Sequence, residues 1–141
     1  MIIWCLHGSL QTAAVWNAIG HAIETKFGSV QVEAFNLYEN KYESFEHWRE
    51  QFYKKVEHQT KGERSLLLGY SMGGRLAMDA LVNYPGMWSG GIVVGADPGL
   101  ISDDARTNQL QKDLEWARRF RTEDIQELLN EWDSLPVFCG R

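Results

Sequence analysis

The 141-residue sequence is poor in cysteine and proline and has no long apolar run. Its two cysteines, Cys5 and Cys139, lie far apart and form no CxxC pair, which argues against a disulfide framework and a zinc site. We expect free thiols, with Cys5 buried as a small hydrophobic residue. No apolar stretch approaches the roughly 18 residues that span a bilayer, and the N-terminus does not resemble a secretory signal. These absences predict a cytoplasmic protein that does not bind a membrane.

The sequence also has no excess of positive charge. Fourteen Lys and Arg are outnumbered by nineteen Asp and Glu, which gives a formal net charge of −5. Because a nucleic-acid backbone is bound by clustered basic side chains, we expect no nucleic-acid partner. There is no Walker motif, no GxGxxG after a strand and no ligand cluster at zinc spacing, so we expect no metal and no organic cofactor.

Short apolar runs alternate with amphipathic stretches in the first 99 residues. Strands are predicted at 2–6, 30–35, 65–68 and 91–94, and the apolar spacing predicts helices over 12–27, from 44 to before 62, and through 76–81. Thr12 and Ser44 are the expected N-caps of the first two helices. This order predicts an α/β fold in which a parallel sheet carries helices on both faces. After residue 99 the sequence becomes charged and helical, with helices expected over 103–120 and 122–132.

Two loops are expected to meet at one edge of this sheet. If the first and third strands are neighbours, with the second strand outside the first and the fourth outside the third, the strand order reverses between the first and third strands. Open α/β sheets bind ligands at such a switch point. The loops that meet there contain His7-Gly8-Ser9 and the segment 69–73. We therefore place the candidate site at this edge.

The segment 69–73 carries the motif Gly69-x-Ser71-x-Gly73 between a predicted strand and a predicted helix. A nucleophile on such a tight turn adopts a strained backbone conformation, and its neighbours must be small. We interpret Ser71 as the nucleophile, with the backbone N–H groups of Met72 and Ser9 as donors of an oxyanion hole. The alternative is that Ser71 only caps a helix.

Beyond this motif, several segments resemble the α/β-hydrolase superfamily and, within it, the SHCHC synthases of menaquinone and phylloquinone biosynthesis. The resemblance covers nearly the whole chain and runs through 6–8, 69–78, 98–100, 116–120, Trp132 and 136–138. It implies that residues 1–99 are the N-terminal part of an α/β-hydrolase core and residues 100–141 the first part of a helical cap. It also implies elimination of pyruvate from a succinyl-enolpyruvyl-cyclohexene carboxylate, with the serine acting as a base toward a substrate carbon.

A small carboxylate substrate requires cationic contacts. Arg75 lies one helical turn after Ser71 and can bind a carboxylate through two hydrogen bonds, although a surface arginine packed against the cap is the alternative. Arg106, in the predicted cap, is a second candidate. We also place Tyr70 and His7 among the substrate-binding residues, although a histidine in such a turn usually organises the loop.

The general base is missing from the sequence. The triad of an α/β-hydrolase runs in the order Ser, acid, His, yet no histidine follows Ser71. Asp97 follows the fourth predicted strand and is expected to be a turn residue beside Pro98. We therefore expect the N-terminal portion of a longer enzyme, in which the unpaired fourth strand promotes either homodimerisation or pairing with a complementary C-terminal fragment.

Three functional hypotheses remain open at this point. The leading one is a lyase that resembles SHCHC synthase. A carboxylic-ester or thioester hydrolase would use the same tight turn, the nucleophile elbow, with Ser71 acylated. A non-catalytic carboxylate-binding remnant would account for the missing histidine.

Overall fold

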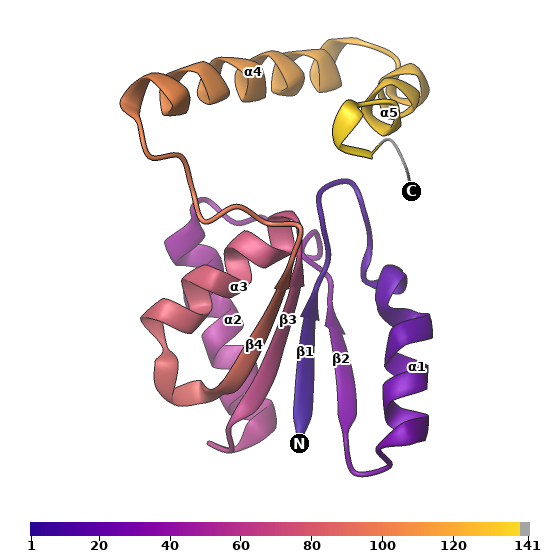
Figure 1. Ribbon diagram of the computed structural model, residues 1–141, viewed down its shortest axis with the longest axis vertical. Helices are drawn as coiled ribbons and strands as arrows, with labels where there is room; N and C mark the ends of the chain where they lie inside the picture. Colours follow the sequence, from indigo (N-terminus) through magenta and orange to yellow (C-terminus); the bar gives the residue numbers. More distant parts are fainter. Residues whose placement is uncertain (139–141) are drawn as a thin grey trace. The chain divides into compact units, whose positions relative to one another are not determined.

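The computed structural model describes residues 1–138, which divide into two compact units, 1–98 and 99–138. The first unit contains a sheet of four parallel strands in the order β2-β1-β3-β4 (Figure 1). The strands are β1 (Ile2–Leu6), β2 (Gln31–Phe35), β3 (Ser65–Tyr70) and β4 (Trp88–Val94). The predicted α/β fold and strand neighbours are therefore confirmed, and β4 begins three residues before the predicted strand.

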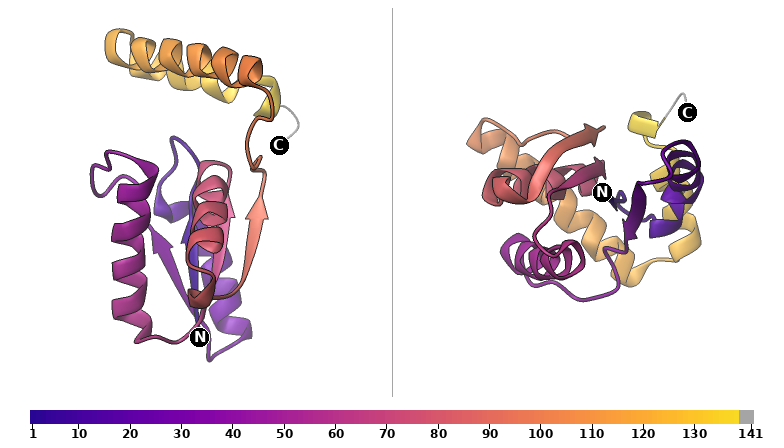
Figure 2. Two further views of the ribbon diagram at one scale, coloured as in Figure 1. Left: turned by 90° about the vertical axis from the view of Figure 1, so that its left-hand side faces the viewer. Right: turned by 90° about the horizontal axis from the view of Figure 1, so that it is seen from below.

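Helices cover both faces of this sheet, as Figures 1 and 2 show. On one face lies α1 (Asn17–Lys26), which follows a short 3-10 turn at Ala13–Trp16. The other face carries α2 (Phe45–Thr60) and α3 (Met72–Asn83), and a 3-10 turn at Pro85–Met87 leads into β4. A bidentate ion pair between Arg49 and Asp79, with its shorter contact at 2.8 Å, joins α2 to α3.

The hydrophobic core lies between the sheet and the α2–α3 pair. Phe52 of α2 is its centre, because its ring stacks on Trp48 at 5.0 Å and on Trp88 at 6.0 Å, and meets the edge of Trp4 at 5.6 Å. All four side chains are buried. These aromatic rings, contributed by β1, α2 and β4, give this face of the sheet most of its packed apolar surface.

The two predicted N-caps differ in outcome. Ser44 caps α2 as predicted, with its hydroxyl accepting the N–H of His47 at 3.1 Å. Thr12 precedes the 3-10 turn, but its side chain accepts no hydrogen bond from that turn, so the predicted cap is wrong. A 3-10 turn starts the helical segment here, and α1 proper begins at Asn17.

The side of α1 that is buried against the sheet differs from the side that the apolar spacing of 12–27 predicts. Val15 and Ile19 are part of that apolar spacing yet are exposed, whereas Trp16 and Gly20 are buried. Gly20 faces β2 so closely that a Cβ there would lie 3.3 Å from the Val32 side chain. The orientation of α1 is therefore set by the close approach of its backbone to the sheet at Gly20, more than by the apolar area that the helix buries.

The second unit consists of α4 (Asp103–Thr122), α5 (Ile125–Asp133) and a 3-10 turn at Pro136–Phe138. Ser102 and Asp124 cap the two helices through their side chains. Arg119 of α4 binds Glu131 of α5 at 2.6 Å and lies over the Trp116 ring. Both predicted helices are confirmed, with ends that differ from the predicted ones by up to three residues. No helix among residues 1–138 is long and apolar enough to cross a membrane.

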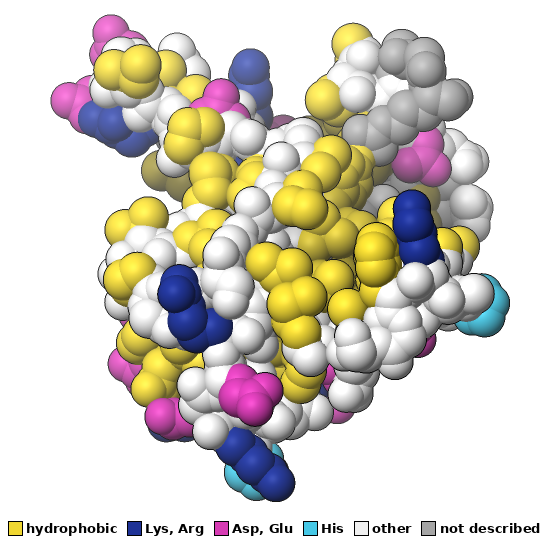
Figure 3. Space-filling view, turned by 60° about the horizontal axis from the view of Figure 1, so that its bottom comes forward, with side chains coloured by type: hydrophobic (Ala, Val, Ile, Leu, Met, Phe, Trp, Pro, Cys, Tyr) yellow, Lys and Arg dark blue, Asp and Glu magenta, His cyan; other side chains and the backbone are white. Residues whose placement is uncertain are grey.

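One face of the β3–β4 half of the sheet remains open within the described residues. Ile92 and Val94 of β4 are 60% and 48% exposed. Figure 3 shows hydrophobic side chains gathered across the middle of the face that it views. Of the described strands only β3 pairs with β4, and β4 carries no charged residue, whereas the opposite edge strand β2 carries Glu33. An apolar edge without charge favours association with another chain.

We therefore expect the 141-residue chain to self-associate or to bind another polypeptide at β4. Sedimentation velocity at micromolar concentration should give a species heavier than 16.2 kDa. Ile92→Lys should shift it toward the monomer, because a charge on an edge strand opposes pairing. Val82→Lys, at a 78% exposed apolar position on α3, is the matched control and should leave the distribution unchanged. A 16.2 kDa species throughout would contradict self-association.

Candidate active site

Ser71 occupies a strained turn between β3 and α3. Its φ and ψ are 53° and −118°, a combination that L-residues seldom adopt. The Ser71 N–H donates to Val94 O at 2.9 Å, and its carbonyl accepts the N–H groups of Gly74 and Arg75 at 2.9 and 3.1 Å. The Ser71 side chain makes no capping hydrogen bond, which removes the capping alternative. The conformation is that expected of a nucleophile elbow.

Three glycines around Ser71 are required by their neighbours. A Cβ on Gly73 would lie 2.5 Å from His7 O and closer still to Leu6 O. A Cβ on Gly69 would meet the first turn of α3, and one on Gly74 would lie 2.6 Å from the Ala96 Cβ. Side chains cannot be accommodated at such distances without moving backbone. The GxSxG spacing is thus explained by contact between α3 and the ends of β1 and β3.

Two backbone donors are available near this turn. The N–H of Met72, the first residue of α3, and the N–H of Ser9, in the loop after β1, have no hydrogen-bond acceptor among residues 1–138. The neighbouring Gly8 N–H is already taken by Gln11 Oε1 at 3.0 Å. The strand order places the β1 and β3 loops at the switch point, as predicted. These are the two N–H groups that the sequence assigned to an oxyanion hole.

His7 is fully buried, with 0% of its side chain exposed. Its Nε2 accepts the backbone N–H of Leu37 at 3.0 Å. Because a backbone N–H can only donate, Nε2 carries no proton, and Nδ1–H therefore donates to Gly8 O at 2.9 Å. Both ring nitrogens are thus engaged by the chain itself. The imidazole holds loops in place, and this position offers it neither a free nitrogen nor an open surface for a substrate.

Tyr70, the last residue of β3, is half-buried between two glycines. A Cβ on Gly8 would lie 3.1 Å from its ring and one on Gly95 would lie 3.3 Å away. Gly95 has a φ of +59°, so glycine suits this position for its backbone as well. The Tyr70 ring therefore lies between the ends of β1 and β4, directly before the strained serine.

The two candidate arginines have different surroundings. Arg75 lies exposed on the first turn of α3, and no described residue forms a hydrogen bond or ion pair with its guanidinium. Arg106 belongs to the second unit, where its guanidinium binds the carbonyls of Leu100 and Ile101 and the carboxylate of Asp103. Asp97 is exposed just after β4. A substrate contact from either arginine stays a prediction.

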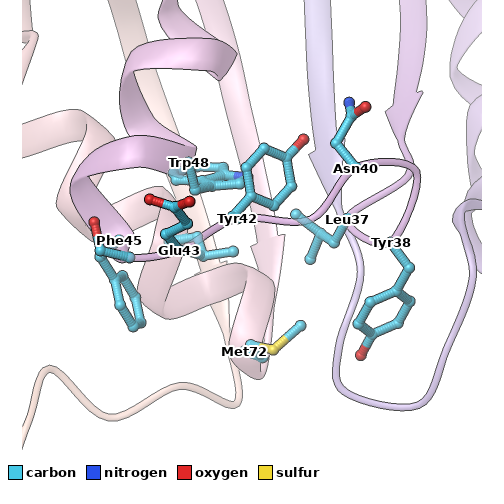
Figure 4. Close-up of a pocket in the computed structure, with 10 residues that line it drawn as sticks. Leu37, Tyr38, Asn40, Tyr42, Glu43, Phe45, Trp48 and Met72 are labelled. Carbon is cyan, nitrogen blue, oxygen red and sulfur yellow. The ribbon is translucent and has the colours of Figure 1, made fainter.

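A cavity of about 370 Å³ lies beside the elbow, and it was not predicted from the sequence. Met72 and Leu76 of α3 form one wall (Figure 4). The rest comes from the β2–α2 loop and the start of α2, with the lining residues Leu37, Tyr38, Asn40, Tyr42, Glu43, Ser44, Phe45 and Trp48. The only available indication was the density of aromatic residues between 35 and 53.

Other titratable groups do not supply a base or a metal site. Burial raises the pKa of the Cys5 thiol to about 12, which confirms the predicted buried, unreactive cysteine. Cys139 lies outside the described residues. His21 is on α1, and His47 and His58 are on α2. Among residues 1–138 no three His, Cys, Asp or Glu side chains converge as metal ligands.

Comparison with known sequences identifies relatives that match about half of the chain. No protein-family model matches the chain. The 2-succinyl-6-hydroxy-2,4-cyclohexadiene-1-carboxylate (SHCHC) synthase of Escherichia coli O1:K1 is 42% identical over 74 residues, which are 52% of this chain and 29% of that protein. The corresponding enzyme of Pectobacterium atrosepticum is 42% identical over 78 residues, 55% of this chain and 31% of that protein. The match thus spans less than a third of each relative.

Solved structures agree in fold. MenH from S. aureus superposes with a TM-score of 0.80 at 22% identity, over 99% of this chain and 54% of that one. The first unit thus has the fold of an α/β-hydrolase core, and the chain is similar in sequence to SHCHC synthases over 74–78 residues. A marine microorganism esterase also superposes, with a TM-score of 0.68 at 21% identity, over 89% of this chain and 48% of that one. At such identities these structures establish the fold alone, and the residues described here form part of that core.

The turn at Ser71 should be intolerant of added volume. Gly73→Ala should destabilise the protein by about 1–3 kcal/mol, because its Cβ would overlap the carbonyls at the end of β1. Gly86→Ala is the matched control, since nothing lies within 4 Å of a Cβ there. Urea unfolding followed by circular dichroism measures both. Equal midpoints for the two variants would refute the close contact.

Proposed function

We propose that this chain supplies the serine, oxyanion-hole and carboxylate-binding part of a lyase that resembles SHCHC synthase. The observation that supports it most is the strained conformation of Ser71, held between β4 and α3 beside the free N–H groups of Met72 and Ser9. Backbone strain of this kind is found mainly at catalytic and ligand-binding residues. The 42% identity to SHCHC synthases supports the choice of reaction.

The proposed reaction is elimination of pyruvate from 2-succinyl-5-enolpyruvyl-6-hydroxy-3-cyclohexene-1-carboxylate. Ser71, once deprotonated, removes a proton from a ring carbon. The electrons of that C–H bond form a new ring double bond, the existing ring double bond shifts by one position, and the C–O bond to the enolpyruvyl group breaks. Enolpyruvate leaves with the electron pair and takes up a proton to give pyruvate. Negative charge that develops on the substrate is stabilised by the N–H groups of Met72 and Ser9.

Deprotonation of Ser71 requires a base that these 141 residues do not offer. No histidine follows Ser71, and His7 has both nitrogens engaged. When serine and base act as a unit, loss of either one costs roughly six orders of magnitude in turnover. We therefore propose that the base is supplied from outside these 141 residues, and that these residues alone have only slight activity.

Added imidazole should replace the missing base in part. Pyruvate release, followed with lactate dehydrogenase and NADH, should rise about tenfold with imidazole in the unaltered chain, less than the gain from a positioned base. Ser71→Ala should not respond to imidazole, whereas Ser29→Ala, at an exposed serine, should respond like the unaltered chain.

Three results would contradict the lyase. Equal imidazole responses of the unaltered chain and Ser71→Ala would remove Ser71 from the chemistry. Rapid hydrolysis of a simple acyl ester without pyruvate, with a fluorophosphonate attached to Ser71, would establish the hydrolase instead. Substrate binding without any pyruvate would favour the non-catalytic carboxylate binder.

Arg75 should bind a substrate carboxylate. Arg75→Gln should weaken substrate binding about tenfold, because it removes a charge-assisted, forked contact near the surface. Arg75→Lys keeps the charge but not the fork, so its loss should be smaller. Titration calorimetry on the slowly reacting chain measures the dissociation constant. Arg121→Gln, at an exposed arginine of the second unit, is the control, and an equal loss there would show a non-specific effect.

A further inference from the structure

The cavity beside Met72 is built mainly from apolar surface. Tyr38 and Phe45 lie about half exposed, at 53% and 51%, whereas Trp48 is only 2% exposed. Leu37 and Leu76 complete the apolar lining. Concave apolar surface of this kind, with a few polar groups, is typical of small-molecule sites. At about 370 Å³ the cavity is roughly two and a half times the ~150 Å³ that accommodates benzene, so two fused rings would fit.

The charge around this cavity disfavours an anion. Glu43 is the only ionisable carboxylate in the lining, and no Lys, Arg or His lines the cavity. A carboxylate bound here would be desolvated without a cationic partner, which is costly. The exposed guanidinium of Arg75 is absent from this lining. The group that this cavity binds is therefore uncharged.

Two polar groups of the lining residues lack partners. Trp48 Nε1 and Tyr42 Oη are both buried, and neither has a hydrogen-bond partner within the described residues. In Figure 4 the nitrogen of the Trp48 indole lies on the side of the Tyr42 ring. Buried donors are almost always satisfied in folded proteins, by protein, water or ligand. An indole N–H can only donate, so its partner must be an acceptor.

From these observations we propose that the cavity binds an uncharged, ring-sized apolar group that carries a hydrogen-bond-accepting oxygen. Met72 contributes its side chain to the cavity and its N–H to the candidate oxyanion hole. The cavity therefore holds the apolar ring of the substrate next to the reacting centre, while the carboxylates lie outside it. This second statement rests on the proposed function of Ser71, whereas the binding itself does not.

Three naphthalene derivatives of similar shape test which chemical group the cavity prefers. They are 2-acetylnaphthalene with an accepting carbonyl, 2-ethylnaphthalene without it, and 2-naphthoate with a negative charge. Spectra of the ¹⁵N-labelled indole groups should show 2-acetylnaphthalene shifting the Trp48 N–H. It should bind about fivefold more tightly than 2-ethylnaphthalene, the gain of one neutral hydrogen bond. 2-Naphthoate should bind at least about tenfold more weakly than 2-acetylnaphthalene.

Variants of the two unpartnered groups should remove the preference for the carbonyl. Trp48→Phe deletes the N–H, and Tyr42→Phe deletes the hydroxyl at a residue outside the buried core, which keeps the test valid if Trp48→Phe fails to fold. The acetyl-to-ethyl affinity ratio should fall toward one in at least one variant. Trp132→Phe, in the second unit, should retain the ratio. An unmoved Trp48 N–H, tightest binding of 2-naphthoate, or an unchanged ratio in both variants would overturn the proposal.

The role beside Ser71 is tested separately. Ser71→Ala should bind 2-acetylnaphthalene as the unaltered chain does, and the ligand should slow imidazole-assisted pyruvate release at least about twofold at saturation. Binding in a chain that never releases pyruvate would retain the cavity and refute the lyase. Binding with pyruvate release unaffected would retain the lyase and overturn the placement of the cavity beside the reacting centre.

Discussion

The contact between the first turn of α3 and the end of β1 is the constraint on which the rest of the site depends. Gly73 lies against the carbonyl oxygens of Leu6 and His7, at a distance that leaves no room for a side chain. This contact forces the chain to reverse direction at Ser71, and the left-handed backbone there follows from it. It also brings the free N–H groups of Met72 and Ser9 to the same edge of the sheet. The strain at one residue is thus maintained by packing at another.

Much of this arrangement could be predicted because its causes are local in the sequence. Four apolar runs gave four strands, and a parallel sheet with short crossovers has few possible orders. The elbow was predictable for a similar reason, since glycines at 69 and 73 on either side of a serine indicate that the backbone there has no room for side chains. Ser44 was recognised as a cap because its partner, the His47 N–H, lies three residues away.

Features that depend on distant contacts were not predictable. The orientation of α1 follows from how Gly20 meets Val32 of β2, and counting apolar residues selected positions next to the buried ones, such as Ile19 beside Gly20. The cavity is assembled from the β2–α2 loop and α3, whose contributions show no common pattern along the chain. His7 was placed among the substrate-binding residues because the sequence cannot show that Leu37, thirty positions away, occupies its Nε2.

The imidazole of His7 has a mechanical consequence. One of its nitrogens is bound to Leu37, in the wall of the cavity, and the other to Gly8, next to Ser9 in the loop that carries an oxyanion donor. A rigid five-membered ring thus spans the two loops and sets their separation. A ligand that displaced Leu37 would therefore also move Gly8 and the neighbouring Ser9 N–H through this ring. The shape of the cavity and the position of the candidate oxyanion donor are thus linked by one side chain.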